Sequence, residues 1–181
     1  MFTGFEVLPP ARLREEVEAA TLPRNLGALL DQAAGRHAGT VALSFFDQGI
    51  DITWADLAAR VERAARGLAT LGVRHGSHVA VLLPNVPEFP VAWLALARLG
   101  AVMTPVNITY TPREVAYVLA DAAVEFLVVH ADLLDRVDAI EPAPLPAARV
   151  VVVGGPAPAP RRAWDDLPAG AGALPAVDVD P

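Results

Sequence analysis

Polar side chains gather where an apolar stretch of the sequence ends. Residues 101–106 have the composition of a buried strand, and Asn107, Thr109 and Tyr110 follow it directly, ahead of a new helix. Side-chain amide and hydroxyl groups donate and accept hydrogen bonds, so they suit the recognition of a ligand. Rossmann-like sheets bind their ligands beyond the carboxyl ends of the strands. These three residues are therefore the first candidates for a binding site.

The other strand ends carry no complete catalytic or cofactor motif. Gly154 and Gly155 follow a strand, but prolines come next instead of the helix that a phosphate site needs, so this pair predicts a simple turn. His75 and His78 lack further ligands at metal spacing. No serine sits in a Gly-x-Ser-x-Gly turn. We predict no catalytic, metal-binding or cofactor-binding residue in this chain.

The composition excludes several classes of chemistry. All 14 basic residues are arginine and cysteine is absent, which excludes a lysine Schiff base, a Walker-type phosphate loop, a thiolate and a disulfide. The formal charge of −7 argues against binding to nucleic acid or to an anionic membrane. No apolar run approaches the ~20 residues that span a bilayer, and the first residues do not resemble a signal peptide. We therefore expect a cytoplasmic protein.

The apolar content of the chain is high. Hydrophobic residues make up 54% of the chain, even without glycine, against the usual ~45–50%. Two explanations remain open, a coding bias toward alanine, valine and leucine or an apolar surface that a missing partner covers. The second explanation predicts self-association of the isolated chain.

Helical spacing and unbroken apolar runs alternate along the chain. The predicted helices cover 25–34, 54–71, 87–99, 132–140 and a segment that begins after Thr111, and the predicted strands cover 41–46, 50–53, 78–83, 101–106, 125–130 and 149–153. Thr53 and Thr111 each have an acid three residues later, as a capping box requires, and Asn85 is predicted to cap the helix that begins near Glu88. That helix is apolar nearly all round, so we expect protein to enclose it.

Strands and helices at this spacing predict a Rossmann-like α/β fold. It would have a mostly parallel sheet with helices on both faces, preceded by a helix and a small β-ribbon. Nine of the 17 prolines lie in the last 41 residues. Residues 156–181 therefore predict a flexible connector rather than a proline-rich ligand, with local docking expected near residues 164–167.

The stretch from about Leu26 to Val129 resembles the start of the adenylate-forming acyl-CoA synthetase superfamily. NLGALLDQAA followed by VALSF is similar to its opening helix and strand, and ITWADL resembles its Leu-Thr-Tyr-x-Glu-Leu motif. VAVLLPNVPEF and LARLGAVMTPVN resemble the next strand-helix-strand unit, and YTPREVAYVLADA resembles the helix that follows. An ordered series of segments is more specific than any one of them. TPVNITYTPRE is most similar to ligases of fatty and other medium- to long-chain acids.

The resemblance implies a ligase that uses ATP and Mg²⁺ to adenylate a carboxylate and then transfers the acyl group to coenzyme A. The family's phosphate loop and catalytic lysine have no counterpart in this sequence. We therefore expect an N-terminal fragment: an extension over 1–20, an α/β subdomain over 21–155, and the connector over 156–181 leading to the missing loop. Its partners would be the rest of the ligase, the acid and coenzyme A. The fragment alone is expected to be inactive and to bind no cofactor.

The same resemblance gives the candidate residues a role. Asn107, Thr109 and Tyr110 would face the crevice that holds the acyl and pantetheine groups in the whole enzyme. Two alternatives remain, that Asn107 only ends the strand and that Thr111 only caps its helix, and the capping box favours the latter. For the chain as a whole, the alternative is a non-catalytic α/β binding or interaction module.

Overall fold

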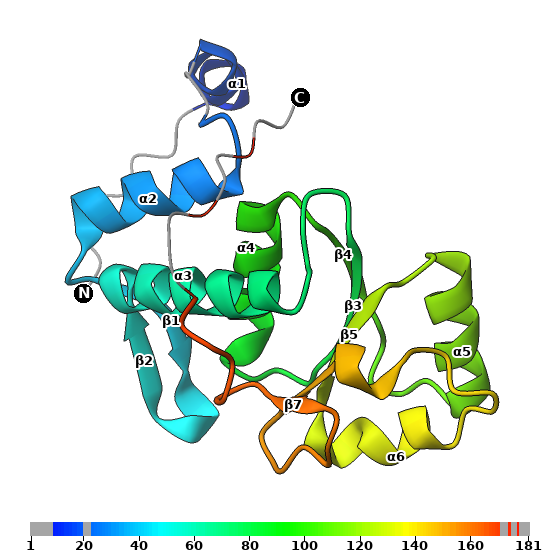
Figure 1. The fold of residues 1–181 in the computed structure, drawn as a ribbon. Coiled ribbons are helices and arrows are strands. Elements are labelled where there is room, and N and C mark those ends of the chain that lie inside the picture. Colours follow the sequence, from blue (N-terminus) through cyan, green and yellow to red (C-terminus); the bar gives the residue numbers. More distant parts are fainter. Residues whose placement is uncertain (1–8, 20–22, 171–173, 175–176, 178–181) are drawn as a thin grey trace.

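The computed structural model describes residues 9–19, 23–170, 174 and 177. Its helices are α1 (Pro10–Ala19), α2 (Leu26–His37), α3 (Trp54–Thr70), α4 (Glu88–Leu99), α5 (Pro112–Asp121) and α6 (Leu134–Asp138). Its strands are β1 (Val41–Phe45), β2 (Ile50–Thr53), β3 (His78–Leu82), β4 (Val102–Pro105), β5 (Phe126–His130), β6 (Val150–Val153) and β7 (Arg162–Ala163). The sequence did not predict α1, which stands apart from the rest of the chain in Figure 1.

The main sheet is parallel, and its strands lie in the order β4-β3-β5-β6-β7. Counted along the chain, this is the 2-1-3-4-5 order of a flavodoxin-like doubly wound sheet. The first strand therefore lies inside the sheet, with β4 on one side and β5 on the other. The predicted Rossmann-like fold is confirmed, including the antiparallel ribbon of β1 and β2 ahead of the sheet.

Helices cover both faces of the sheet because each interior strand is apolar on both sides (Figure 1). In β3, Val79 and Val81 belong to a core shared with α3 and α4, whereas Ala80 and Leu82 belong to a core shared with α5. All four side chains are fully buried. Alternate residues of one strand thus hold the two layers of helices together.

Three sequence expectations around α2 and α4 need correction. The first helix does not end at residue 34 as predicted, because α2 continues to His37. Asn85 does not cap α4: the helix begins at Glu88 behind Pro87, and no side chain caps it. The outer face of α4 is not enclosed within the described residues, since Trp93 is 46% exposed.

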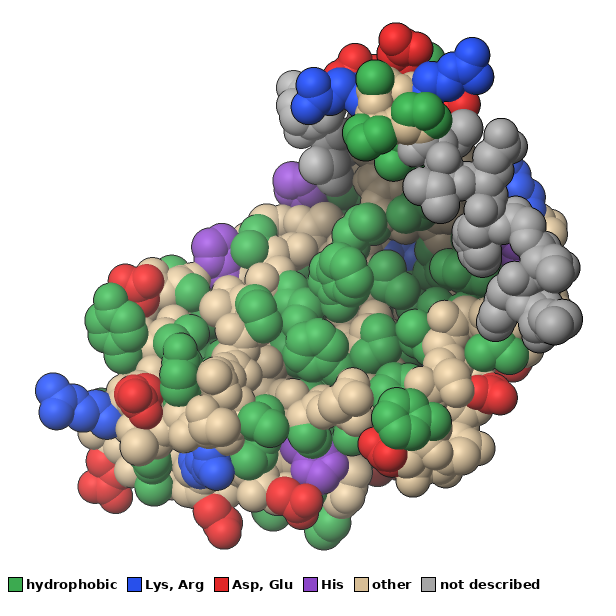
Figure 2. Space-filling view, turned by 180° about the vertical axis from the view of Figure 1, so that it is seen from behind, with side chains coloured by type: hydrophobic (Ala, Val, Ile, Leu, Met, Phe, Trp, Pro, Cys, Tyr) green, Lys and Arg blue, Asp and Glu red, His purple; other side chains and the backbone are tan. Residues whose placement is uncertain are grey.

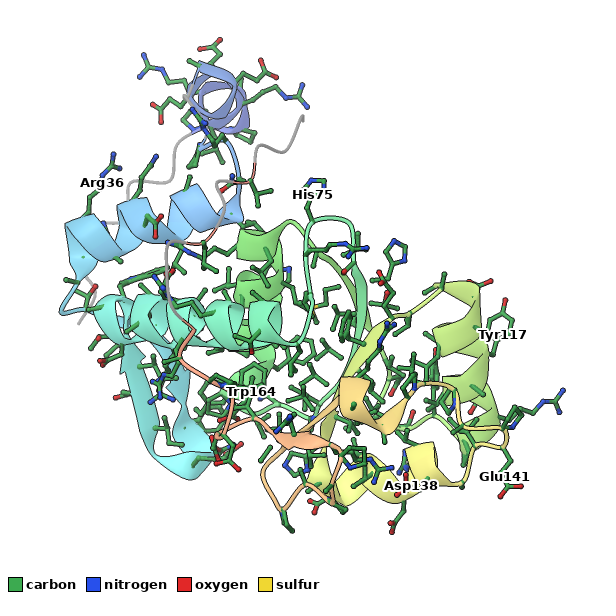
Figure 3. The ribbon with its side chains drawn as sticks, viewed as in Figure 1. Arg36, His75, Tyr117, Asp138, Glu141 and Trp164 are labelled. Carbon is green, nitrogen blue, oxygen red and sulfur yellow. The ribbon has the colours of Figure 1, made fainter. Side chains whose placement is uncertain are left out.

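The proline-rich segment after β6 packs on the rest of the chain. Its Arg161 pairs with Asp138 of α6, and β7 then adds an edge strand beside β6. Leu167 is buried in the core under α3. Figure 1 shows the segment crossing that helix, and Figure 3 labels Trp164 in the same region. The expected local docking near residues 164–167 is therefore observed. Of the predicted approach to a phosphate loop, residues 171–173, 175–176 and 178–181 lie outside the described residues.

A polar joint connects α2, α3 and α4. Arg98 lies 2.8 Å from Asp31 and 2.8 Å from Glu62, and Glu62 also pairs with Arg66. Burial acts to lower the pKa of Arg98, but the hydrogen bonds and charges of the two carboxylates together raise it above its ordinary value. The guanidinium of Arg98 is therefore charged at neutral pH. None of the described helices combines the length and apolar character needed to cross a membrane.

Candidate functional site

An open groove of about 470 Å³ lies where β3 and β4 end. The carboxyl ends of neighbouring parallel strands meet at one edge of the sheet, and the first turn of α4 closes one side of this space. Its lining is mostly apolar and consists of Leu83, Pro84, Asn85, Phe89, Pro105, Val106, Asn107 and Ile108. The groove can therefore hold an apolar group and offers only two amide side chains for hydrogen bonding.

The groove does not lie at the position that strand order alone would suggest. In a doubly wound sheet the ligand crevice usually opens where the order reverses, here between β3 and β5. The neighbouring end of β5 is occupied by the ring of His130, which packs on Gly154. A Cβ atom at Gly154 would lie 2.6 Å from Nε2 of this ring. Gly154 also has a φ of +76°, so turn geometry and close packing together account for glycine at this position.

Asn107 lies in the groove, and the oxygen of its side-chain amide is already engaged in hydrogen bonds within the protein. Its Oδ1 accepts hydrogen bonds from the backbone N–H and the hydroxyl of Thr109, both at 2.9 Å. This geometry supports the structural interpretation, in which Asn107 ends the strand and shapes the next turn. Its Nδ2 has no protein partner among the described residues, and Asn107 is exposed. One amide donor thus remains available to a ligand.

The three predicted site residues do not converge on one space. Asn107 lines the groove, Thr109 is exposed but lines none of the described cavities, and Tyr110 lines a separate cavity of about 340 Å³ against α5. Tyr110 also packs against the core under α5. The sequence correctly located the strand end, but it did not show that neighbouring side chains diverge there.

The loop that follows β4 is held from two sides. Tyr110 donates its backbone N–H to the carbonyl of Asn107 at 3.1 Å, which closes the turn from within. From α6, Arg136 donates through Nη1 to the carbonyl of Ile108 and, at 3.1 Å, to the carbonyl of Tyr110. A helix from the next strand unit therefore fixes one wall of the groove.

The end of this loop is the predicted capping box of α5, and the structure confirms it. Thr111 donates its backbone N–H and its hydroxyl to Oε2 of Glu114, each at 2.8 Å. The backbone hydrogen bond, followed by the hydroxyl bond, lowers the pKa of Glu114, while burial raises it slightly. Both bonds favour the ionised carboxylate.

Thr111→Ala is expected to raise the pKa of Glu114 toward its ordinary value, because the hydroxyl bond is lost while the backbone bond remains. A carboxylate whose folded pKa is depressed stabilises the fold above the unfolded pKa of about 4.3, and this contribution disappears as the pH falls through the folded pKa. An NMR titration of the Glu114 side chain in both proteins measures the change. Identical midpoints in the two proteins would contradict the capping interpretation.

The apolar lining of the groove was missed by the sequence analysis. Phe89, Leu83 and Ile108 contribute its bulky apolar side chains, and Ile108 is 38% exposed. The sequence motifs at the strand ends are polar, whereas this groove is shaped chiefly by hydrophobic side chains. An isoleucine among the polar residues that follow the strand end is the one sequence signal that could have indicated it. Across the described residues, no three His, Cys, Asp or Glu side chains come together as a metal site requires.

Comparison with curated proteins finds acid:CoA ligases that are similar in sequence. A 4-coumarate–CoA ligase of Oryza sativa subsp. japonica is 37% identical over 132 residues, which is 73% of this chain and 24% of the relative. A crotonobetaine/carnitine–CoA ligase of Salmonella typhimurium is 36% identical over 111 residues, or 60% of this chain and 22% of the relative. The chain thus spans about a quarter or less of the length of these curated relatives.

The fold is also similar to that of solved ligase structures. A long-chain-fatty-acid-CoA ligase from Archaeoglobus fulgidus superposes with a TM-score of 0.76 and 26% identity, over 90% of this chain and 33% of that one. The family model for AMP-binding enzymes matches residues 30–178, which include the groove and the packed segment after β6. The chain therefore belongs to the AMP-binding enzyme family.

Proposed function

We propose that this chain is the N-terminal part of an ATP-dependent acid:CoA ligase. The whole enzyme would adenylate a carboxylic acid with ATP and Mg²⁺, release pyrophosphate, and transfer the acyl group to the thiol of coenzyme A. The observation that carries the proposal is the family match over residues 30–178, together with relatives whose names specify acid:CoA ligases. We place this enzyme in the cytoplasm.

The groove at the ends of β3 and β4 would contribute to the site for the acyl or pantetheine group. Its mostly apolar lining supports contact with a hydrocarbon portion, and the free Nδ2 of Asn107 supports a single hydrogen bond to a polar atom beside it. We infer a medium- or long-chain acid. Thr109 and Tyr110 would contact the substrate from the neighbouring part of the same loop.

Adenylation would require residues that this chain does not supply. The resemblance to the family implies that a phosphate loop of backbone N–H groups and a lysine ammonium group stabilise the triphosphate. The chain has no lysine, and its glycine pair after β6 is followed by prolines and packs against the side chains of β5 and its following turn. We therefore propose that the chain alone is inactive and that the remainder of the ligase is its partner.

Pyrophosphate release by the full-length protein tests the proposal. With ATP, Mg²⁺ and coenzyme A, we expect release to depend on a carboxylic acid and to be fastest with medium- or long-chain acids. The isolated chain should release none and should show no heat of ATP binding in calorimetry. A full-length protein that is inactive with every acid would favour the non-catalytic binding module instead. Adenylation by the isolated chain would overturn the proposal that this chain alone is inactive.

Exposed apolar side chains support a partner for this chain. Trp93 of α4 is 46% exposed, and Phe46 at the tip of the ribbon is 84% exposed. Figure 2 shows hydrophobic side chains spread widely over the face seen from behind. In isolation the chain is expected to self-associate, which sedimentation can measure.

A further inference from the structure

We propose that Arg136 is a positioning residue for the groove at the ends of β3 and β4. Its guanidinium fixes the loop that carries Asn107 and Ile108, two of the residues lining that groove. The inference deepens the proposed ligase function, since its effect on catalysis depends on the groove receiving the acid or the pantetheine group.

The contacts of Arg136 are directed at the backbone of the loop rather than at an acid. Nη1 donates to the carbonyls of Ile108 and Tyr110, which lie 28 and 26 residues away in the chain. No carboxylate lies within ion-pair distance of Arg136 among the residues that the structure describes. Hydrogen bonds from a charged donor are about twice as strong as neutral ones. Arg136 therefore stabilises the loop through hydrogen bonds and does not form a surface ion pair with a described residue.

The two carbonyls belong to the part of the loop that the inner turn leaves unsupported. The turn within the loop uses Oδ1 and the carbonyl of Asn107, and the capping box uses Thr111. Between these points lies Ile108, exposed at the groove wall. Without Arg136, the Ile108 carbonyl would keep no hydrogen bond to any described residue. The backbone at Ile108 would then be more mobile, and its side chain would move with it.

Amide hydrogen exchange in the chain itself tests the structural half of the inference. Arg136→Met keeps the length of the side chain but removes its donors, and we expect the amides of Thr109, Tyr110 and Thr111 to exchange about tenfold faster. Exchange in β3 should stay unchanged, which shows that the fold is intact. Arg136→Lys keeps a charged donor and should restore part of the protection.

Arg36→Met is the matched control, because Arg36 lies in the last turn of α2 and does not line the groove, and Figure 3 shows its side chain pointing away from the main sheet. This variant should leave exchange in the loop unchanged. The inference is overturned if Arg136→Met does not accelerate exchange of the loop amides, or if Arg36→Met accelerates it equally.

Steady-state kinetics of the full-length ligase test the functional half. A loosened groove wall weakens binding of the acid in both the ground state and the transition state, so KM should rise about fivefold while kcat stays within about twofold. The variant Arg136→Lys should recover part of the change in KM. A lower kcat with an unchanged KM would overturn the positioning role. If the unmodified full-length protein has no ligase activity, the proposed function fails, and the exchange experiment still decides whether Arg136 holds the loop.

Discussion

Gly67→Ala is expected to lower the free energy of unfolding by about 1–2 kcal/mol, although alanine is the better helix former by ~1 kcal/mol. Gly67 lies inside α3, and a Cβ atom there would lie 2.6 Å from Cβ of Leu167 and 3.3 Å from the carbonyl oxygen of Pro168. Because the Cβ of Leu167 is attached to the backbone, no rotamer change can relieve the contact. The whole segment must move, and Leu167 loses its burial.

Gly35→Ala provides the matched control for this prediction. Gly35 also lies within a helix, α2, but an added Cβ would meet nothing within 4 Å. This variant should gain stability by about 0.5–1 kcal/mol. Urea unfolding measures both changes, and limited proteolysis should cut residues 161–170 faster in Gly67→Ala. Two variants that shift stability in the same direction would contradict the packing of Leu167 on α3.

Leu82→Ala is expected to cost about 3 kcal/mol, near the middle of the range for buried leucines. Leu82 is fully buried and contributes to the core between the sheet and α5. Strands on both sides hold β3 in place, so the surrounding structure cannot collapse into the cavity that the substitution leaves. Urea unfolding of the variant measures the loss.

Leu13→Ala is the control, because Leu13 on α1 is 52% exposed. Its effect should stay within about 0.5 kcal/mol, as for other surface positions. A loss below about 1 kcal/mol for Leu82→Ala would show that the core under α5 is loosely packed.

The sequence predicted those parts of the fold that depend on local chemistry. Unbroken apolar runs identified β3, β5 and β6, because a strand covered on both faces leaves few positions for polar residues. Thr53 and Thr111 marked the starts of α3 and α5, since the side-chain oxygen of each accepts a hydrogen bond from the backbone N–H three residues later. The predicted helix over 87–99 ends where α4 ends, because Gly100 follows it with a φ of +67°.

The sequence did not predict features that depend on contacts between distant segments. The strand β7 is only two residues long and exists because β6 offers a free edge. Asn85 has the chemistry of a cap, but the turn before α4 places it two residues ahead of the capping position at Pro87. The apolar groove and its support by Arg136 depend on how the loop after β4 meets α6, which no local pattern encodes.

The interior position of β3 has a consequence for synthesis of the protein. Both of its neighbours, β4 and β5, come later in the chain. A nascent polypeptide that has not yet extended beyond Phe126 therefore leaves one edge of β3 unpaired, together with the apolar side chains of Ala80 and Leu82. Exposed apolar surface and unpaired strand edges make such a partly folded chain prone to aggregate. The ribosome must add the whole of α5 and β5 before this first strand is protected from aggregation.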